Sequence, residues 1–264
     1  MSEMQALEKF SHSVHTVFTD IDDTLTDEGT LRPEAYESLW RLHEAGIKVI
    51  PVTGRPAGWC EMIARFWPVH GVIGENGGFY FRYADRKMKR HFVFDEKTMA
   101  KNRESLEQVR YEVLRNVRGS AVASDQFSRL MDLAIDFAED VGPLSDADID
   151  KIVAIFEKHG AVAKVSSIHV NGWFGDYDKL SMTKLYCKNE LGFTFDDENS
   201  KGAIAFCGDS PNDEPMFKAF KSSFAVANIV KFADRLKSKP AFVANLSGGH
   251  GFVQIANQIL ATRK

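Results

Sequence analysis

Short apolar runs alternate with helical patterns along the first third of the chain. The run TVFT, residues 16–19, predicts a buried strand, and apolar residues at helical spacing then extend from Pro33 to Gly46, residues typical of a helix start and a helix end. A second strand pattern (IKVIPVT), a second helical pattern (GWCEMIARF) and a third strand pattern (GVIGE) follow. Strands that alternate with helices at this rhythm indicate a parallel sheet covered by helices on both faces.

The pattern changes in the middle of the chain, from about residue 83 to residue 176. A charged link, RYADRKMKRH, precedes a long helical pattern with apolar residues such as Leu106 and Val113. The strand-like run LMDLAIDF is followed by a helix that Ser145 begins and Gly160 ends, and then by two strand patterns, AVAKVS and SIHVNGW. Two strands in direct succession indicate antiparallel pairing, so this region is expected to form an inserted α+β unit.

The alternation of the first third returns after Asp178. A helical pattern that stops before Gly192 leads to the strand patterns AIAFCGD, SFAVA and AFVA, separated and followed by the helical patterns EPMFKAF, IVKFADRL and FVQIANQIL. The prediction is a Rossmann-like α/β core domain, residues 1–82 and 178–264, interrupted by a smaller α+β domain, residues 83–177.

Composition narrows the class of protein. The 264 residues are 44% hydrophobic and 27% charged, which is ordinary for a globular protein, and the net charge of -4 without a basic run argues against nucleic acid as a partner. No apolar run approaches the roughly 20 residues of a membrane span. The three cysteines show no C-x-x-C spacing and are expected to be reduced thiols. We therefore expect a cytoplasmic protein that acts on small molecules and has no membrane partner, while its oligomeric state stays open.

Acidic residues are concentrated directly after the first strand. Asp20, Asp22, Asp23, Asp27 and Glu28 fall within nine positions. Carboxylates this close repel one another, and their pKa values should rise unless a cation lies among them. The last two fit a solvated turn, so the first part of the cluster is where a cation is expected.

Three loops of the predicted sheet carry reactive side chains. Asp20 and Asp22 follow the first strand, Thr53-Gly54-Arg55 follows the second, and GDSPND, residues 208–213, follows a later one. The loops after the carboxyl ends of parallel strands meet at one edge of the sheet, where ligands bind. We expect these three loops to form one site.

The two aspartates after the first strand suit phosphoryl transfer. The Asp20 carboxylate can attack a phosphoryl group to form an acyl phosphate, while Asp22 protonates the leaving oxygen and later deprotonates water. A divalent ion is needed to offset the charge of the carboxylates and of the phosphoryl group. Mg²⁺ fits because it takes oxygen ligands.

The other two loops can complete such a site. Asp209 and Asp213 supply a further acidic ligand and its support, and Thr53 with the following glycine offers a hydroxyl and backbone amides to phosphate oxygens. A lysine should offset the remaining negative charge, and Lys179 and Lys184 are the two candidates.

At these residues the sequence resembles the haloacid dehalogenase superfamily of phosphatases. The motif D-x-D-x-T matches Asp20, Asp22 and Thr24, the Thr of the second motif matches Thr53, and G-D-x-x-N-D matches Gly208, Asp209, Asn212 and Asp213. The insertion, together with GENGG, is similar to subfamily IIB with a C2B cap, which includes Cof-like, sucrose-phosphate and trehalose-phosphate phosphatases and phosphomannomutases. The sequence departs from the family at Asp23, where glycine is usual, and at Leu180, where a Lys-Gly pair is common.

The resemblance implies a role for each matching residue. It makes Asp20 the nucleophile and a Mg²⁺ ligand, Asp22 the general acid and base that also binds the metal through its backbone carbonyl, Asp209 a metal ligand and Asp213 a support for metal-bound water. Thr53, Gly54, Arg55 and Asn212 would bind phosphate, and Lys179, at the start of its helix, would complete the site. Lys184 lies more than one helical turn further on.

The predicted function is a Mg²⁺-dependent phosphomonoester hydrolase that acts through an aspartyl-phosphate on a small sugar phosphate or a related metabolite. The rivals are a sugar phosphomutase, which returns the phosphoryl group to the sugar, and a non-catalytic sensor of sugar phosphate. Four residues near the end of the insertion either face the substrate or form a cap core or hinge: His169, Asn171, Trp173 and Phe174.

Overall fold

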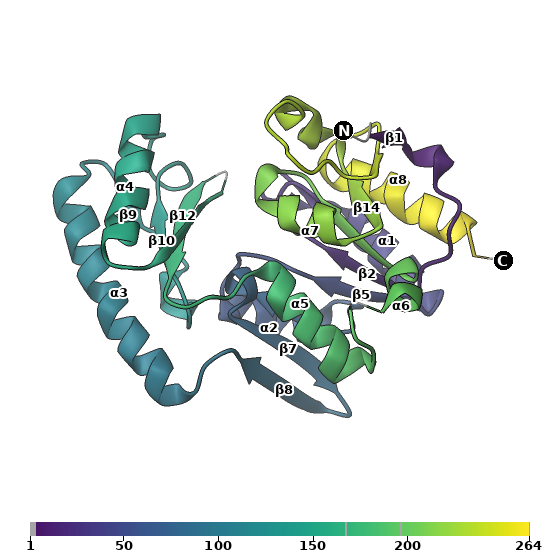
Figure 1. Cartoon of the computed structure of the whole chain (residues 1–264), viewed down its shortest axis with the longest axis horizontal. Coiled ribbons are helices and arrows are strands. Elements are labelled where there is room, and N and C mark those ends of the chain that lie inside the picture. Colours follow the sequence, from purple (N-terminus) through teal and green to yellow (C-terminus); the bar gives the residue numbers. More distant parts are fainter. Residues whose placement is uncertain (1–3, 167, 196, 264) are drawn as a thin grey trace.

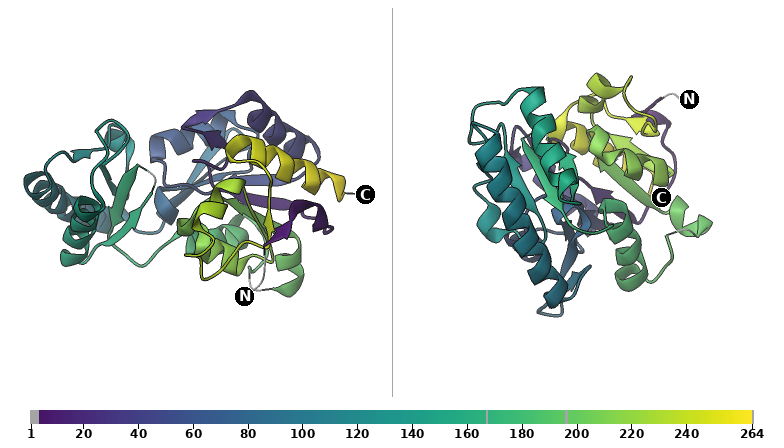
Figure 2. Two further views of the ribbon diagram at one scale, coloured as in Figure 1. Left: turned by 90° about the horizontal axis from the view of Figure 1, so that it is seen from above. Right: turned by 60° about the vertical axis from the view of Figure 1, so that its left-hand side comes forward.

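The computed structural model describes residues 4–166, 168–195 and 197–263, and it has two parts that lie side by side (Figure 1). The larger part contains both ends of the chain. The smaller part, which we call the cap, is joined to the larger one by two connections, one at each of its ends (Figures 1 and 2).

A six-stranded parallel sheet lies at the centre of the larger part. Its strands follow the order β1-β15-β14-β13-β2-β5, and every neighbouring pair is parallel. Their bounds are β1 (Gln5–Ala6), β2 (Thr16–Thr19), β5 (Lys48–Pro51), β13 (Ile204–Gly208), β14 (Ser222–Ala225) and β15 (Phe242–Val243). All four residues of β2 are buried because both faces of the sheet are covered, which confirms the predicted α/β core.

Helices cover the two faces of this sheet. They are α1 (Pro33–Glu44), α2 (Ala57–Phe66), α5 (Lys179–Tyr186), α7 (Glu214–Ala219) and α8 (Gly248–Ala261), while the short helix α6 (Glu198–Gly202) precedes β13. Val17 belongs to the hydrophobic cluster that contains residues of α1, α2 and α8, whereas its neighbour Phe18 belongs to the cluster that contains residues of α5 and α7. Successive side chains of one strand thus enter two different cores.

Short helical turns connect several of these elements. They are η1 (Leu7–Lys9), η2 (Glu75–Gly77), η4 (Cys187–Leu191), η5 (Pro211–Asp213) and η6 (Ala227–Phe232). The sequence predicts a helix at IVKFADRL, and this prediction is corrected: the structure has the short 3₁₀ turn η6 in this region. Ile229 and Leu236 of this segment still face the core, and a short 3₁₀ piece suffices to place them in a connector.

A three-stranded antiparallel sheet extends the larger part. It consists of β6 (Val72–Gly74), β7 (Phe79–Ala84) and β8 (Lys87–Phe92), and a single bridge from Val52 to Ile73 joins it to the end of β5. The prediction of a charged link at RYADRKMKRH is therefore wrong, since most of this segment forms the β7–β8 hairpin. Asp85 and Arg86 take positive φ values at its tight turn. Charged side chains suit β8 because it is an edge strand, and they hide its strand pattern.

A second, smaller hairpin follows the first strand of the core. It pairs β3 (Thr26–Asp27) with β4 (Thr30–Leu31). Glu28 is exposed at its turn with a positive φ, as expected for a solvated turn, and Asp27 forms an ion pair with Arg32.

The cap is an antiparallel sheet with two helices on one face. The strands follow the order β11-β12-β10-β9, with bounds β9 (Ala121–Val122), β10 (Leu133–Asp136), β11 (Val162–Val165) and β12 (His169–Trp173). The helices are α3 (Glu96–Asn116) and α4 (Asp146–Lys158), and the turn η3 (Gln126–Ser128) lies between β9 and β10. In Figure 1 the sheet lies between these helices and the larger part. The expected antiparallel pairing of β11 with β12 is confirmed.

The cap has a hydrophobic cluster of its own, formed by residues between 106 and 174. The domain limits given above, 1–82 and 178–264 for the core and 83–177 for the cap, stay a prediction. In the part of the chain that the structure describes, no helix combines the length and the apolar character that crossing a bilayer requires.

Candidate active site

The three reactive loops meet at one edge of the parallel sheet. Asp20 follows β2, Thr53 follows β5 and Asp209 follows β13, and these three strands are neighbours in the sheet. Asp20 and Asp209 lie at the floor of a cavity of about 470 Å³ between the core and the cap, and Gly54, the residue after Thr53, also lines it. The sheet topology thus brings together residues that are up to 189 positions apart in the sequence, from Asp20 to Asp209.

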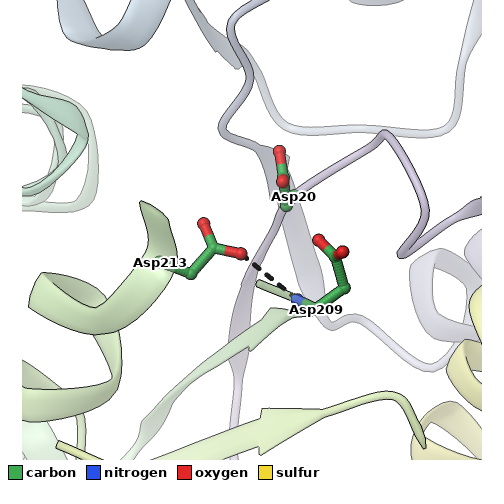
Figure 3. A group of neighbouring side chains, drawn as sticks. All are labelled: Asp20, Asp209 and Asp213. Carbon is green, nitrogen blue, oxygen red and sulfur yellow. Dashed lines mark hydrogen bonds between the residues drawn. The ribbon is translucent and has the colours of Figure 1, made fainter. Parts of the chain in front are cut away.

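Three carboxylates form a tight group at this floor. Asp20 lies at the end of β2, Asp209 follows β13, and Asp213 comes from the short turn η5 (Figure 3). An oxygen of each lies within 4.8 Å of the others, and all three side chains are buried. One Asp213 oxygen, Oδ2, accepts the N–H of Asp209 at 3.2 Å (Figure 3).

The electrostatics of this group call for a cation. Burial, together with the neighbouring carboxylates, raises the pKa of Asp20 to about 7 although Lys179 opposes the shift. Burial, then Asp213 and Asp20, raises the pKa of Asp209 to about 9. An all-oxygen donor set with unbalanced negative charge fits Mg²⁺.

Lys179 is the lysine that reaches the group. Its Nζ atom lies 3.1 Å from Oδ1 of Asp20 and 3.0 Å from Oδ1 of Asp213. Burial opposes its charge, but the two carboxylates raise the Lys179 pKa above the ordinary value. A capping box between Asp178 and Ser181 fixes the start of α5, where Lys179 is the first helical residue.

The other candidate, Lys184, lies elsewhere. Its Nζ atom is 5.6 Å from the centre of the Phe195 ring, on the side of α5 that packs with the second hydrophobic cluster. Of the two lysines, the structure brings only Lys179 to the carboxylates.

Asp22 is held by Arg55. Its two carboxylate oxygens accept hydrogen bonds from Nε at 3.0 and 3.1 Å, and Oδ1 also accepts from Nη2 at 2.8 Å. Burial opposes the charge of Arg55, but Asp22 keeps its pKa above the ordinary value. Phosphate binding by Arg55 stays a prediction. The contact that the structure shows is with Asp22, the residue expected to act as general acid and base.

The remaining predicted phosphate ligands line or support the cavity. Thr53 is buried, and its hydroxyl oxygen accepts the N–H of Arg55 at 3.0 Å. Gly54 and Asn212 line the cavity, and Asn212 accepts a hydrogen bond from Ser210 at 2.7 Å. Their roles toward a phosphate stay predictions.

The departure at Asp23 has a local explanation. Asp23 has a φ of 56°, in the left-handed region that favours glycine and that aspartate also tolerates. Its neighbour Thr24 donates a hydrogen bond to Oδ1 of Asp209 at 3.3 Å, which links the first motif to the fourth.

Asn76 is a cavity residue that the sequence reasoning did not single out. A Cβ atom at Gly54 would lie 3.2 Å from Oδ1 of Asn76, so the glycine permits this close approach. The Nδ2 atom of Asn76 is buried and has no hydrogen-bond partner among the described residues. The signal was present in GENGG, where Asn76 follows a strand that ends at the same edge.

Glu75, the residue before it, joins the core to the cap. Its buried carboxylate accepts backbone N–H groups from Ala57, at the start of α2, and from Leu130, Met131 and Asp132 of the cap. Burial, followed by Asp132, raises the Glu75 pKa to about 8. A glutamate in a glycine-rich loop gave no sequence signal for this contact.

The structure also decides the question left open for the four residues near the end of the insertion. His169 and Asn171 line the cavity. Trp173 is buried and stacks on Tyr177, and Phe174 packs against the hydrophobic cluster of the cap. Two of the four therefore line the cavity and two have structural positions.

Two further charged residues of the cap reach the core. Arg129 donates a hydrogen bond to the carbonyl oxygen of Gly54 at 3.0 Å and pairs with Asp125 and Asp132. Glu139 lies 3.6 Å from Arg55. Neither could be found from local sequence, because these contacts depend on how the cap docks.

The chain is similar to known proteins in sequence and in structure. Residues 17–126 match the family described as haloacid dehalogenase-like hydrolase. The chain is 25% identical to a phosphoglycolate phosphatase of Nitrosopumilus maritimus over 252 residues. This alignment covers 92% of this chain and 95% of that protein.

Solved structures share the fold over almost the whole chain. The Thermoplasma acidophilum protein 0175 superimposes with a TM-score of 0.73 at 21% identity, over 94% of this chain and 99% of that one. The sucrose-phosphatase of Synechocystis, solved with sucrose and phosphate, gives a TM-score of 0.62 at 14% identity, over 93% and 98%. The segment matched by the haloacid dehalogenase-like hydrolase family, residues 17–126, contains the D-x-D-x-T loop and the Thr53 loop described above.

Proposed function

We propose that the protein is a Mg²⁺-dependent phosphomonoester hydrolase that acts through an aspartyl-phosphate on a small phosphorylated metabolite. The observation that carries this proposal is the buried group of Asp20, Asp209 and Asp213 at the floor of a cavity, in which one lysine contacts two of the three carboxylates. A protein that only bound its ligand would not need a nucleophile at Asp20, which is buried beside two other carboxylates with incomplete charge compensation.

The residues fit a bound Mg²⁺. Asp20 and Asp209 offer carboxylate oxygens, and the backbone carbonyl of Asp22 would be a third oxygen ligand. Both oxygens of Asp213 already accept hydrogen bonds, from Lys179 and from the N–H of Asp209, so Asp213 suits the support of metal-bound water. The ion would offset the charge of the carboxylates and of the transferred phosphoryl group.

In the first half-reaction an oxygen of Asp20 forms a bond to phosphorus as the bond from phosphorus to the alcohol oxygen breaks. Asp22 gives its proton to that leaving oxygen. Lys179 holds Asp20 in place through its 3.1 Å contact and adds positive charge where charge develops.

In the second half-reaction, water attacks the phosphorus of the acyl phosphate. Asp22 takes a proton from this water, and the Asp20 carboxylate leaves with its original oxygens. The net change is one phosphomonoester and one water converted into one alcohol and one phosphate.

The cavity sets the class of substrate. Its volume of about 470 Å³ suits a small metabolite. Lys231 and Arg235 line the cavity, and neither forms an ion pair with any residue that the structure describes. The relatives named for phosphoglycolate and for sucrose phosphate suggest two candidates, a phosphorylated small acid and a sugar phosphate. We favour a sugar phosphate or a related metabolite.

The test is release of inorganic phosphate from a panel that contains glucose 6-phosphate, glycerol 3-phosphate, 2-phosphoglycolate and p-nitrophenyl phosphate. We expect hydrolysis that requires Mg²⁺, stops with a chelator and is lost in Asp20→Asn. Conversion of a sugar 1-phosphate to a 6-phosphate with little free phosphate would instead identify a mutase. Binding without turnover of any phosphate ester would identify a sensor.

A further inference from the structure

We propose that Glu139, a residue of the cap, positions Asp22 for proton transfer by holding Arg55. This inference rests on the proposed function, in which Asp22 is the general acid and base. Glu139 follows β10 and does not belong to the motifs of the core. It is a positioning residue, because it acts through Arg55.

The guanidinium group of Arg55 divides its contacts between the core and the cap. Two of its nitrogens, Nε and Nη2, donate to Asp22. The third nitrogen, Nη1, faces the cap and lies 3.6 Å from Oε1 of Glu139 and 4.0 Å from Oδ2 of Asp125. The Trp59 ring covers one face of the guanidinium, with its centre 4.5 Å from Cζ. The orientation of Asp22 therefore depends on groups that fix Arg55 from the opposite side.

Glu139 is itself held firmly by the cap. The buried carboxylate of Asp136 accepts the backbone N–H groups of Ala138, Glu139 and Asp140 at 2.9, 2.8 and 2.8 Å. This fixes the short loop that carries Glu139. The Oε2 atom of Glu139 lies 2.9 Å from Nε2 of His169, on the neighbouring strand β12, at an ion-pair distance but outside hydrogen-bond geometry.

Of the two cap carboxylates near Arg55, Glu139 is the one available to it. Both oxygens of Asp125 accept hydrogen bonds from Arg129, at 2.9 and 3.2 Å. Oε1 of Glu139 lies closer to Arg55 than Asp125 does and faces no other cation within ion-pair distance among the described residues. The chain of contacts Asp136, Glu139, Arg55 and Asp22 thus runs from a rigid part of the cap to the reacting groups.

The consequence is that Asp22 is fully oriented only while the cap is docked on the core. A leaving alkoxide needs the proton of Asp22, whereas p-nitrophenolate leaves without one. Loss of the Glu139 charge should therefore affect esters of alcohols and spare an aryl ester.

The test uses Glu139→Gln, which keeps the shape of the side chain and removes its charge. We expect kcat for glycerol 3-phosphate to fall about tenfold, less than the full contribution of a general acid, while kcat for p-nitrophenyl phosphate changes less than about twofold. KM should change little for both. Glu112→Gln is the matched control, since it removes a cap carboxylate that pairs with Lys158 and His159 on α4 and its end, away from the cavity.

A double-variant cycle separates positioning from cap docking. In the Asp22→Asn background, Glu139→Gln should cause no further loss on glycerol 3-phosphate, because the residue that it positions is gone. Losses that multiply, or equal losses on both substrates, would overturn the proposal. Thermal unfolding shows whether each variant is folded. Glu139→Asp moves the carboxylate back by one methylene, so its kcat on glycerol 3-phosphate should lie between those of wild type and Glu139→Gln.

The failure of the proposed function gives a different result. A wild-type protein that hydrolyses none of the esters would overturn the phosphatase and this inference together. A wild-type protein that hydrolyses both esters, with an unchanged ratio in Glu139→Gln, would overturn only the positioning role.

Discussion

Two buried acidic sites in the core have opposite charge balance. At the cavity floor, Lys179 pairs with two of three clustered carboxylates, and the pKa values of Asp20 and Asp209 rise to about 7 and about 9, chiefly through burial. Beside β7, one carboxylate, Glu190, faces the cations Arg82 and Lys89 and the hydroxyl of Tyr80. Burial alone would raise the Glu190 pKa, but these partners lower it below its ordinary value.

The difference distinguishes a working site from a structural one. The Glu190 site is already compensated by its own chain, and its contacts join β7 and β8 to the end of the α5 region. The Asp20 site holds more negative charge than Lys179 offsets, so under the proposed function a cation from outside would compensate it. A carboxylate cluster that the protein leaves unbalanced is therefore a better indicator of chemistry than acidity alone.

The largest expected effect is on Asp20. Asp20→Asn removes the attacking oxygen charge and should lower phosphate release by about 10³-fold or more. Because one member of a repelling group is lost, the metal-free variant should unfold at the same temperature as wild type or higher. Phosphate release and thermal unfolding check both statements, and near-normal turnover would remove Asp20 from the mechanism.

Asp22→Asn should divide substrates by leaving group. The loss should be about 10²-fold or more for glycerol 3-phosphate and much smaller for p-nitrophenyl phosphate, since only the alkoxide needs a proton. Steady-state kinetics on both esters measure the ratio. Equal losses would show that Asp22 is not the general acid.

The two lysines of α5 provide a matched pair. Lys179→Ala leaves Asp20 and Asp213 without their cation and should reduce turnover by about 10²-fold or more. Lys184→Ala removes a side chain that lies over the Phe195 ring and should change turnover less than about twofold. A dead Lys184 variant beside an active Lys179 variant would reverse the assignment.

Mg²⁺ should stabilise the protein in a pH-dependent way. In metal-free protein, the folded state holds protons on Asp20 and Asp209 that the unfolded state has lost, so the free energy of unfolding should fall as pH rises from about 4 to about 9. Glu75, with a pKa of about 8, adds the same trend. Saturating Mg²⁺ at about 100 times Kd contributes about 2.7 kcal/mol, and its effect should grow with pH. Melting curves with Mg²⁺ and with a chelator test this, and an effect of Mg²⁺ that shrinks with rising pH would contradict it.

The smallest effect is expected at the compensated site. Glu190 has a lowered pKa, so its stabilising contribution is present above its ordinary pKa and is lost as pH falls through the folded value. Glu190→Gln should cost about 1 kcal/mol at neutral pH, less at acidic pH, and leave the Mg²⁺ effect and turnover unchanged. A changed Mg²⁺ dependence would show that the two sites are not independent.

The sequence was sufficient for features that depend on local order. The alternation of strand and helix predicts the parallel sheet, and the position of Asp20, Thr53 and Asp209 at three strand ends predicts that they meet. Helical spacing also favours Lys179 over Lys184, because only the first residue of α5 can reach back over the carboxylates.

Other features depend on packing that local sequence does not encode. The pairing of Arg55 with Asp22 depends on the directions of their side chains. The contact of Glu75 with Leu130 and the contact of Glu139 with Arg55 both depend on how the cap docks on the core, and each joins residues more than 50 positions apart. The β7–β8 hairpin was missed because an edge strand carries charged residues that resemble a linker.

The proposed mechanism requires Asp20 to form a covalent bond to the phosphoryl group. Rapid acid quenching of the enzyme during turnover of p-nitrophenyl phosphate with Mg²⁺, followed by peptide mass spectrometry, measures it directly. We expect a phosphoryl group on Asp20 within the burst of the first turnover, and none in Asp20→Asn. Steady hydrolysis with no phosphoryl group on this residue, or with the group on another residue, would contradict a covalent mechanism through Asp20.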